Sequence, residues 1–166
     1  HCGIKPNNPK KDRAVIFSRV PCKAAAVYTT NKVKGAPITV TKSHLEDGHA
    51  QAVIVNSGNA NTCNADGVQK AEQMCSLAAK ELGIHAQDVI VASTGVIGQP
   101  LPIEPIASHV RQLTEALSAD GSTDAAQAIM TTDTRIKEIA VEFSVDGTVC
   151  RIAGISKGSG MIHPNM

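Results

Sequence analysis

The segment Ser93-Thr94-Gly95 carries residue types that could support acyl chemistry, and it directly follows an apolar run at residues 89–92. Acyl transfer passes through a tetrahedral oxyanion, which needs fixed hydrogen-bond donors aimed at it. A threonine beside a glycine at a strand end offers a hydroxyl and an unobstructed backbone N–H together. The alternative interpretation is an ordinary turn from a strand into a helix.

A glycine-rich segment at residues 154–166 is a second candidate, because Lys157 is the only lysine or arginine within it. Glycine lets another group approach the main chain closely. A single cation among three glycines, directly after an apolar strand pattern, therefore fits the wall of a binding site. A loosely ordered chain end is the competing interpretation.

Two further polar clusters follow apolar segments. Asn56, Asn59 and Asn61 come straight after an apolar run at residues 52–55, and Thr131 stands in the cluster Met130-Thr131-Thr132-Asp133-Thr134 after a short apolar helix pattern. Asparagine tolerates left-handed backbone and stabilises turns, and polar residues also cap helices. Local structural roles therefore compete with binding roles, and the asparagines receive no individual assignment.

The elements that must position these residues indicate an α/β fold with layers of helix and sheet. Strands are predicted at residues 13–18, 24–30, 52–55, 89–92, 139–145 and 149–155, the first two as one hairpin and the last two as another. Helices are predicted at residues 66–82, 102–119 and onward from Ser122. Loops are predicted at residues 1–11 and 31–37. Asp146-Gly147 has the residue types of a tight hairpin turn, Asn64 or Asp66 can begin the first helix, and Gly83 can end it.

The composition excludes several classes of protein. A length of 166 residues suits one domain or one lobe of a larger assembly, and a hydrophobic fraction of 42% with only 2% aromatics predicts a core of Ala, Val, Ile and Leu. The net charge of +1 provides no broad basic face for nucleic acid or an anionic membrane. No apolar run approaches the roughly 18 residues of a membrane span.

Five scattered cysteines favour reduced thiols in a cytosolic protein. None forms a Cys-x-x-Cys pair, and no Cys/His cluster has zinc-ligand spacing. Cys75 falls on the apolar face of a predicted helix, so a catalytic thiol is a minor alternative there. Gly95-Val96-Ile97-Gly98 lacks a nucleotide-binding pattern, and no nucleophile-elbow motif anchors a serine hydrolase.

Five motifs together carry a resemblance to a known family. They are Tyr28-Thr29-Thr30-Asn31, Asn56-Ser57-Gly58-Asn59-Ala60-Asn61, Ser93-Thr94-Gly95-Val96-Ile97-Gly98, Ala128-Ile129-Met130-Thr131-Thr132-Asp133-Thr134 and the last ten residues from Lys157. With Tyr28 in place of a phenylalanine, they resemble the ornithine acetyltransferase family of arginine biosynthesis over essentially the whole chain. In that family the last motif continues with Ala-Thr, and the precursor cleaves itself before the threonine. The resemblance thus implies an α chain whose α/β fold is completed by a separate β chain.

The resemblance implies a glutamate N-acetyltransferase that moves acetyl from N-acetylornithine to glutamate through an acetyl-threonine on the β chain. Thr94 and Gly95 match the family's oxyanion hole. Thr131 matches its substrate-binding threonine, and Lys157 matches a lysine that contacts the substrate. A single cation suits the α-carboxylate of an amino acid as a point charge.

The resemblance also implies that residues 1–166 form one lobe of an α2β2 heterotetramer in the cytoplasm, with no metal or other cofactor. Some members of the family also accept acetyl-CoA as the donor, and that second reaction stays open. Two alternatives remain: a related self-processing aminopeptidase or amidohydrolase, which releases the acyl group to water, and a non-catalytic subunit. The sequence starts at His1 rather than Met, so the lack of a targeting segment decides nothing about location.

Overall fold

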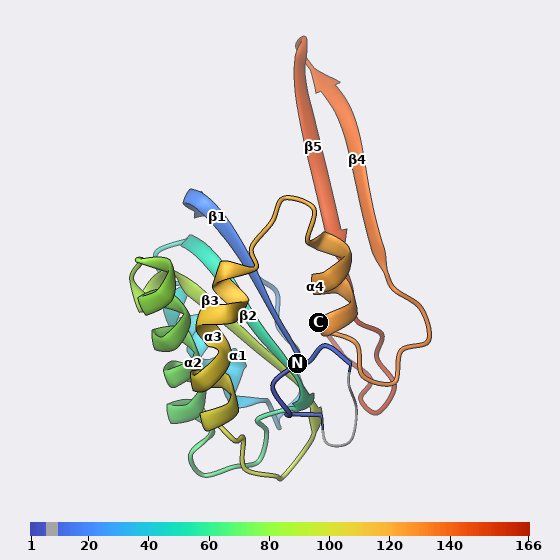
Figure 1. Cartoon of the computed structure of the whole chain (residues 1–166). Helices are drawn as coiled ribbons and strands as arrows, with labels where there is room; N and C mark the ends of the chain where they lie inside the picture. The colour runs from blue at the N-terminus through green and yellow to red at the C-terminus, as the bar shows by residue number, and fades with distance from the viewer. Residues whose placement is uncertain (6–9) are drawn as a thin grey trace.

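The computed structural model describes residues 1–5 and 10–166 as a three-stranded sheet with helices and a separate β-hairpin (Figure 1). Its elements in chain order are β1 (Arg13–Lys23), α1 (Ala36–His44), β2 (His49–Asn59), α2 (Gly67–Leu82), η1 (Ala86–Asp88, a 3-10 turn), β3 (Val89–Val96), α3 (Glu104–Glu115), α4 (Ser122–Ala128), β4 (Glu138–Val145) and β5 (Thr148–Ile155). The mixed helix-and-sheet architecture confirms the predicted α/β class.

The sheet has the order β1-β2-β3, with β1 antiparallel and β3 parallel to the central β2. Val15, Ile54 and Val91 form one row across it, and all three are buried. A parallel pair needs a long crossover connection, and α2 supplies it between β2 and β3. The carboxyl ends of β2 and β3 therefore meet at one edge of the sheet.

Helices α1, α2 and α3 cover one side of the sheet and build the main core with it (Figure 1). Its buried residues are mostly small and aliphatic, as the composition predicted: Ile4, Val15, Val40, Ala52, Ile54, Ala71, Met74, Cys75, Ala78, Ala79, Val89, Val91, Leu101 and Ile106. Helix α2 ends at Gly83, whose left-handed φ of 68° suits glycine, as predicted. Asp66 is the N-cap residue, as predicted, but its side chain forms no capping hydrogen bond.

The N-terminal segment is fastened to the sheet by the fully buried Asp12. Its carboxylate accepts hydrogen bonds from the backbone N–H groups of Cys2, Gly3 and Ile4 at 3.0–3.1 Å. Burial raises the pKa of Asp12, but these bonds and the neighbouring Arg13 outweigh it, so the pKa lies below its ordinary value. This fastening brings residues 4 and 5 against the end of β2.

The C-terminal hairpin β4–β5 projects away from the rest of the molecule (Figure 1). Its turn is the predicted Asp146-Gly147, with φ values of 49° and 79° at the two positions. Both strands are exposed along nearly their whole length. The prediction of a hairpin is confirmed, and its apolar residues have no covering layer among the described residues.

Two predictions about the first third of the chain are wrong. Residues 24–30 form no strand, and β1 pairs instead with β2, whose paired residues lie between 26 positions (Lys23 with His49) and 43 positions (Arg13 with Asn56) further along the chain. β1 itself continues through Pro21 to Lys23, because the pairing register shifts between Phe17 and Cys22 and leaves the proline without a ladder bond to make. The loop predicted at residues 1–11 includes residues 6–9, which lie outside the described residues.

Helix α1 was not predicted. Pro37 lies in its first turn, where the backbone N–H that proline lacks would have no partner within the helix. The following β-branched residues favour strands, but packing decides here: Val40 is buried, and the Thr41 hydroxyl donates a hydrogen bond to the Val91 carbonyl at 2.9 Å. Helix α3 is shorter than the predicted 102–119, and α4 begins at Ser122 as expected.

Candidate active site

The backbones of two glycines are in contact where β2 and β3 end. Gly58 and Gly95 are paired across the strands, with φ values of 115° and 133°. A Cβ atom on Gly95 would lie 2.3 Å from the carbonyl carbon of Gly58 and 2.6 Å from the backbone nitrogen of Asn59. Only glycine fits, so the backbone at Thr94-Gly95 is fixed by main-chain contact rather than by side-chain packing.

Thr94 lies beside this contact, paired with Ser57 in the ladder, and is half-buried. Its hydroxyl forms no hydrogen bond with any residue that the structure describes. A hydroxyl without a protein partner is one of the two kinds of donor that an oxyanion hole uses, the other being a backbone N–H such as that of Gly95. The geometry is compatible with the role predicted for Thr94 and Gly95, and that role stays a prediction.

The three asparagines after β2 are buried and bonded to the backbone. Asn56 donates to the Asn59 carbonyl at 2.9 Å and accepts from the Ser93 hydroxyl. Asn59 donates to the carbonyl of Gln99 at 2.9 Å, and Asn61 donates to that of Gly67 at 2.8 Å. Their side chains therefore stabilise the connections that leave β2 and β3, which is the structural alternative considered from the sequence.

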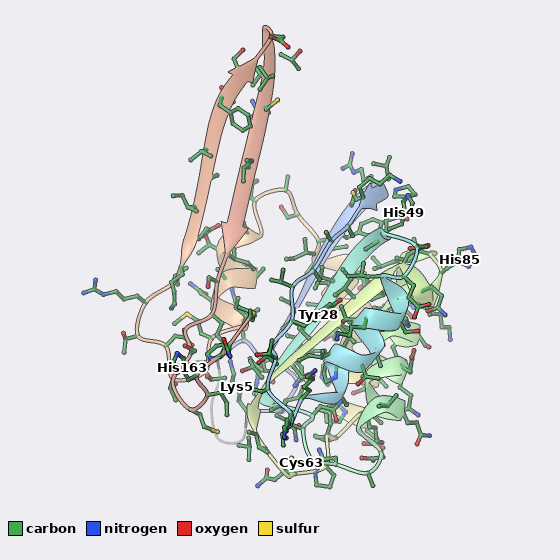
Figure 2. All side chains as sticks on the ribbon, turned by 180° about the vertical axis from the view of Figure 1, so that it is seen from behind. Lys5, Tyr28, His49, Cys63, His85 and His163 are labelled. Atoms are coloured by element: carbon green, nitrogen blue, oxygen red, sulfur yellow. The ribbon has the colours of Figure 1, made fainter. Side chains whose placement is uncertain are left out.

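The end of helix α4 is joined to the same strand ends by two side chains. The Ser57 hydroxyl donates to the Ala128 carbonyl. The buried Lys5 ammonium donates to the carbonyls of Lys11 at 2.6 Å and Met130 at 2.8 Å, and lies 3.5 Å from that of Ala128. Figure 2 shows Lys5 between the sheet and the C-terminal segment that carries His163. The Thr131 segment is thereby placed beside the ends of β2 and β3.

Asp133 joins the two predicted substrate-binding residues to each other. One carboxylate oxygen accepts from the backbone N–H of Thr131 at 3.2 Å and lies 3.4 Å from the Lys157 ammonium. The other oxygen accepts from the Gly158 N–H and pairs with the Lys137 ammonium at 2.9 Å. Thr131 and Lys157, which are far apart in the sequence, thus belong to one cluster.

The pKa of Asp133 lies well below its usual value. Burial alone would raise it, but hydrogen bonds from Lys137, Gly158 and Thr131, together with the charge of Lys157, stabilise the carboxylate. Burial lowers the pKa of Lys5 from its usual value, with Asp12 and Asp133 acting in the opposite direction. Asp133 is therefore ionised at neutral pH and holds the cluster together as an anion.

The last residues of the chain return to the segment before α1. The Asn165 carbonyl accepts hydrogen bonds from the backbone N–H and the hydroxyl of Thr30, at 2.7 and 2.9 Å. Next to this contact, Tyr28 and Ser93 help to line a hollow of about 330 Å³ between α1 and β3. The C-terminal segment, the hollow and the end of β3 are thus neighbours.

The thiol considered as a nucleophile from the sequence, that of Cys75, is unsuited to this role. Cys75 is fully buried in α2, and this burial raises the pKa of its thiol to about 12, so it is not a nucleophile. All five cysteines are free. Within residues 1–5 and 10–166, no group of three or more His, Cys, Asp or Glu side chains could hold a metal ion, and no helix is long and apolar enough to cross a membrane.

The four predicted site residues thus lie at one end of the fold, in two parts. Thr94 and Gly95 end β3, while Thr131 and Lys157 meet at Asp133, and the Ser57–Ala128 hydrogen bond connects the parts. Sequence reasoning did not single out Asp133 or Lys5. The position of Asp133 two residues after Thr131 was the one available signal, because such spacing lets a carboxylate accept the earlier backbone N–H.

Comparison with known proteins decides the family. A model described as the ArgJ family matches residues 1–166. The chain belongs to the ArgJ family. It is 52% identical over 165 residues to the arginine biosynthesis bifunctional protein ArgJ of Symbiobacterium thermophilum, and 49% identical to ArgJ 1 of Clostridium acetobutylicum. These alignments cover 98% and 99% of this chain but 41% and 40% of the relatives, so the chain spans about two fifths of their length.

Two solved structures share the fold. The crystal structure of ArgJ from Bacillus halodurans superposes with a TM-score of 0.90 at 40% identity, covering 99% of this chain and 86% of that one. The ornithine acetyltransferase of Mycobacterium tuberculosis, solved in complex with ornithine, gives a TM-score of 0.87 at 33% identity, covering 99% and 88%. The predicted membership and α/β fold are therefore confirmed.

Proposed function

We propose that this chain is the α chain of a glutamate N-acetyltransferase that moves acetyl from N-acetylornithine to glutamate. Its ArgJ relatives are named for arginine biosynthesis, and one structural neighbour is an ornithine acetyltransferase with bound ornithine. The observation that supports the proposal is that the Ser57–Ala128 hydrogen bond and the Asp133 contacts bring the segments of Thr131 and Lys157 to the end of the sheet where Thr94 and Gly95 lie.

In the first half-reaction, the hydroxyl of an N-terminal threonine on the β chain attacks the acetyl carbonyl of N-acetylornithine. The α-amine of that threonine takes the hydroxyl proton, since an α-amino pKa of about 7.7–8.0 suits transfer at neutral pH. The Thr94 hydroxyl and the Gly95 N–H donate to the oxyanion. Collapse of the intermediate breaks the C–N bond, and the amine of ornithine leaves with the proton.

In the second half-reaction, the α-amine of glutamate attacks the acetyl-threonine carbonyl. The same donors stabilise the second oxyanion, the threonine oxygen leaves and regains its proton, and N-acetylglutamate is formed. Lys157 and Thr131 bind the amino acid in both halves. The mechanism uses no metal or prosthetic group, and acetyl-CoA could replace N-acetylornithine as the acyl donor without altering the second half.

The partner in this proposal is a β chain that corresponds to the rest of the relatives' length, and the assembly is a cytoplasmic α2β2 heterotetramer. Two features support a partner chain. The chain covers only 41% of its Symbiobacterium relative, and apolar residues of the β4–β5 hairpin, such as Val141 and Ile152, are half or more exposed.

The test is Thr94→Ala in the complete processed enzyme. We expect the rate of acetyl transfer to fall by about 10²–10³-fold, as for other lost oxyanion donors, while Thr94→Ser restores most of it. Thr114→Ala is the matched control, because its hydroxyl bonds only to the Arg111 carbonyl of its own helix. The assay follows N-acetylglutamate and free acetate separately. An unchanged rate in Thr94→Ala would remove the oxyanion role, and acetate as the main product would indicate a hydrolase.

A further inference from the structure

We propose that Asp133 is a positioning residue that sets Lys157 and Thr131 for the carboxylate of the substrate, an inference that rests on the proposed acetyl transfer. Its side chain is only 2% exposed. It contacts both predicted binding residues, one through the Thr131 backbone and the other through the Lys157 ammonium. A buried carboxylate between two binding groups fixes their separation.

The backbone around Asp133 is shaped for this contact. The Gly158 N–H donates to the carboxylate, and a Cβ atom on Gly158 would lie 2.7 Å from the same oxygen. A residue with a side chain could not approach as closely. The segment that follows β5 therefore contacts Asp133 immediately after Lys157, and this fixes the backbone from which the Lys157 side chain extends.

Lys157 keeps the capacity to bind a carboxylate in this arrangement. Its ammonium donates to the Gly158 carbonyl at 2.7 Å and lies 3.4 Å from Asp133, beyond the 2.7–3.2 Å typical of an N–H···O bond. An ammonium has three hydrogens, so hydrogens remain for a ligand, and the side chain is 22% exposed. Asp133 orients Lys157 without using up its donors.

The charges of the cluster leave room for one anion. The two lysines that contact Asp133, Lys137 and Lys157, carry two positive charges against its one negative charge, and the nearby Lys5 adds a further positive charge. Lys5 cannot accept the same role, because its ammonium already faces three backbone carbonyls. The arrangement therefore fits one carboxylate, taken at Lys157.

The experiment uses the complete processed enzyme with Asp133→Asn, Lys157→Met and the double variant. Acetyl acceptance is measured with glutamate and with glutamate 1-amide, in which a neutral amide replaces the α-carboxylate. Asp124→Asn is the matched control, since this residue of α4 is exposed and pairs only with Lys11. Binding of ornithine is measured by calorimetry on the same proteins, and thermal unfolding checks each fold.

We expect Asp133→Asn to raise the KM for glutamate by about 10- to 100-fold, the effect expected when a misplaced Lys157 loses its bond to the substrate carboxylate, with kcat changed much less. The preference for glutamate over the amide should shrink by a similar factor. Ornithine binding should weaken in parallel. In the Lys157→Met background, Asp133→Asn should add little to either loss, because it acts through Lys157. Asp124→Asn should leave all values unchanged.

Three results would overturn the proposal. A lower KM for glutamate in Asp133→Asn would mean that Asp133 competes with the substrate for Lys157. Equal losses for glutamate and its amide would mean a general structural role, and fully multiplicative losses in the double variant would mean an effect independent of Lys157. A wild-type enzyme that binds ornithine without transferring acetyl would contradict the proposed function instead, while ornithine binding by the variants would still test Asp133.

Discussion

The β1–β2–β3 sheet and the β4–β5 hairpin are built from similarly apolar strands, but they differ in what covers them. In the sheet, Ile54 and Val91 are 1% and 3% exposed beneath the helices. In the hairpin, Ile139 and Phe143 are 69% and 42% exposed. Because side chains alternate along a strand, the hairpin has one apolar face and one more polar face. The polar face carries the Glu142–Arg151 ion pair, and the apolar face carries Ile139, Val141, Phe143 and Val145.

This difference teaches where the stability of the chain resides. An isolated two-stranded hairpin is marginal in water, whereas the sheet shares a continuous core with three helices. The sheet should therefore fold without a partner chain. The hairpin should become ordered and energetically important through its apolar face when a partner covers it.

The largest effect should come from Ile54→Ala, compared with the same substitution at Ile139. Removing a fully buried isoleucine at the centre of the sheet should lower the free energy of unfolding by about 2–5 kcal/mol, since a cavity remains. Ile139→Ala should change it by less than about 0.5 kcal/mol, because the side chain is exposed. Urea unfolding of the chain measures both. Similar losses at the two positions would refute the division into a self-sufficient sheet and a dependent hairpin.

An intermediate effect is expected from Asp12→Asn, which weakens the fastening of the N-terminal segment to the sheet. At neutral pH the free energy of unfolding should fall by about 1.5–3 kcal/mol, the range for bonds to a charged group. The pKa of Asp12 is lowered in the folded chain, so its stabilisation exists above the unfolded value near ~3.9 and is lost as pH falls through the folded pKa. The difference in free energy of unfolding between wild type and Asp12→Asn should therefore become smaller at acidic pH. If that difference did not depend on pH, the charge of Asp12 would be excluded as the source of the stabilisation.

The smallest effect on the chain alone should come from Phe143→Ser on the apolar face of the hairpin. We expect the free energy of unfolding to change by less than about 0.5 kcal/mol. Association with the proposed β chain should weaken by about tenfold or more, because a buried aromatic side chain contributes strongly to an interface. Association of separately purified chains, followed by calorimetry, measures this. Ser144→Ala, on the other face, is the control. If Phe143→Ser left association unchanged, the apolar face would not be the covered one.

Periodic segments with local signals were predictable from the sequence. Helix α2, the β4–β5 hairpin and its Asp146-Gly147 turn follow from spacing and turn chemistry. The pairing of β1 with β2 did not follow, because register depends on contacts between distant residues. Helix α1 was missed because the β-branched residues around Val40 favour strands, and packing overrode that preference.

The candidate site divides in the same way. Thr94, Gly95, Thr131 and Lys157 stood out through local composition and family resemblance. Their mutual placement depends on Lys5, Ser57 and Asp133, which join segments far apart in the chain. Ordinary residue types in such connecting roles leave no local pattern, so the sequence could indicate the parts of the site but not the contacts between them.

The contact of Lys5 with a segment far along the chain has a consequence for the order in which parts of the protein fold during synthesis. Its ammonium bonds to the Met130 carbonyl, 125 positions later, and Thr30 bonds to Asn165 across 135 positions. Loops of this size close slowly, because chain entropy is lost before the contact forms. A ribosome-bound chain would therefore complete the sheet before the site. We expect arrested nascent chains to resist protease at β2 well before the segment around Lys5 does.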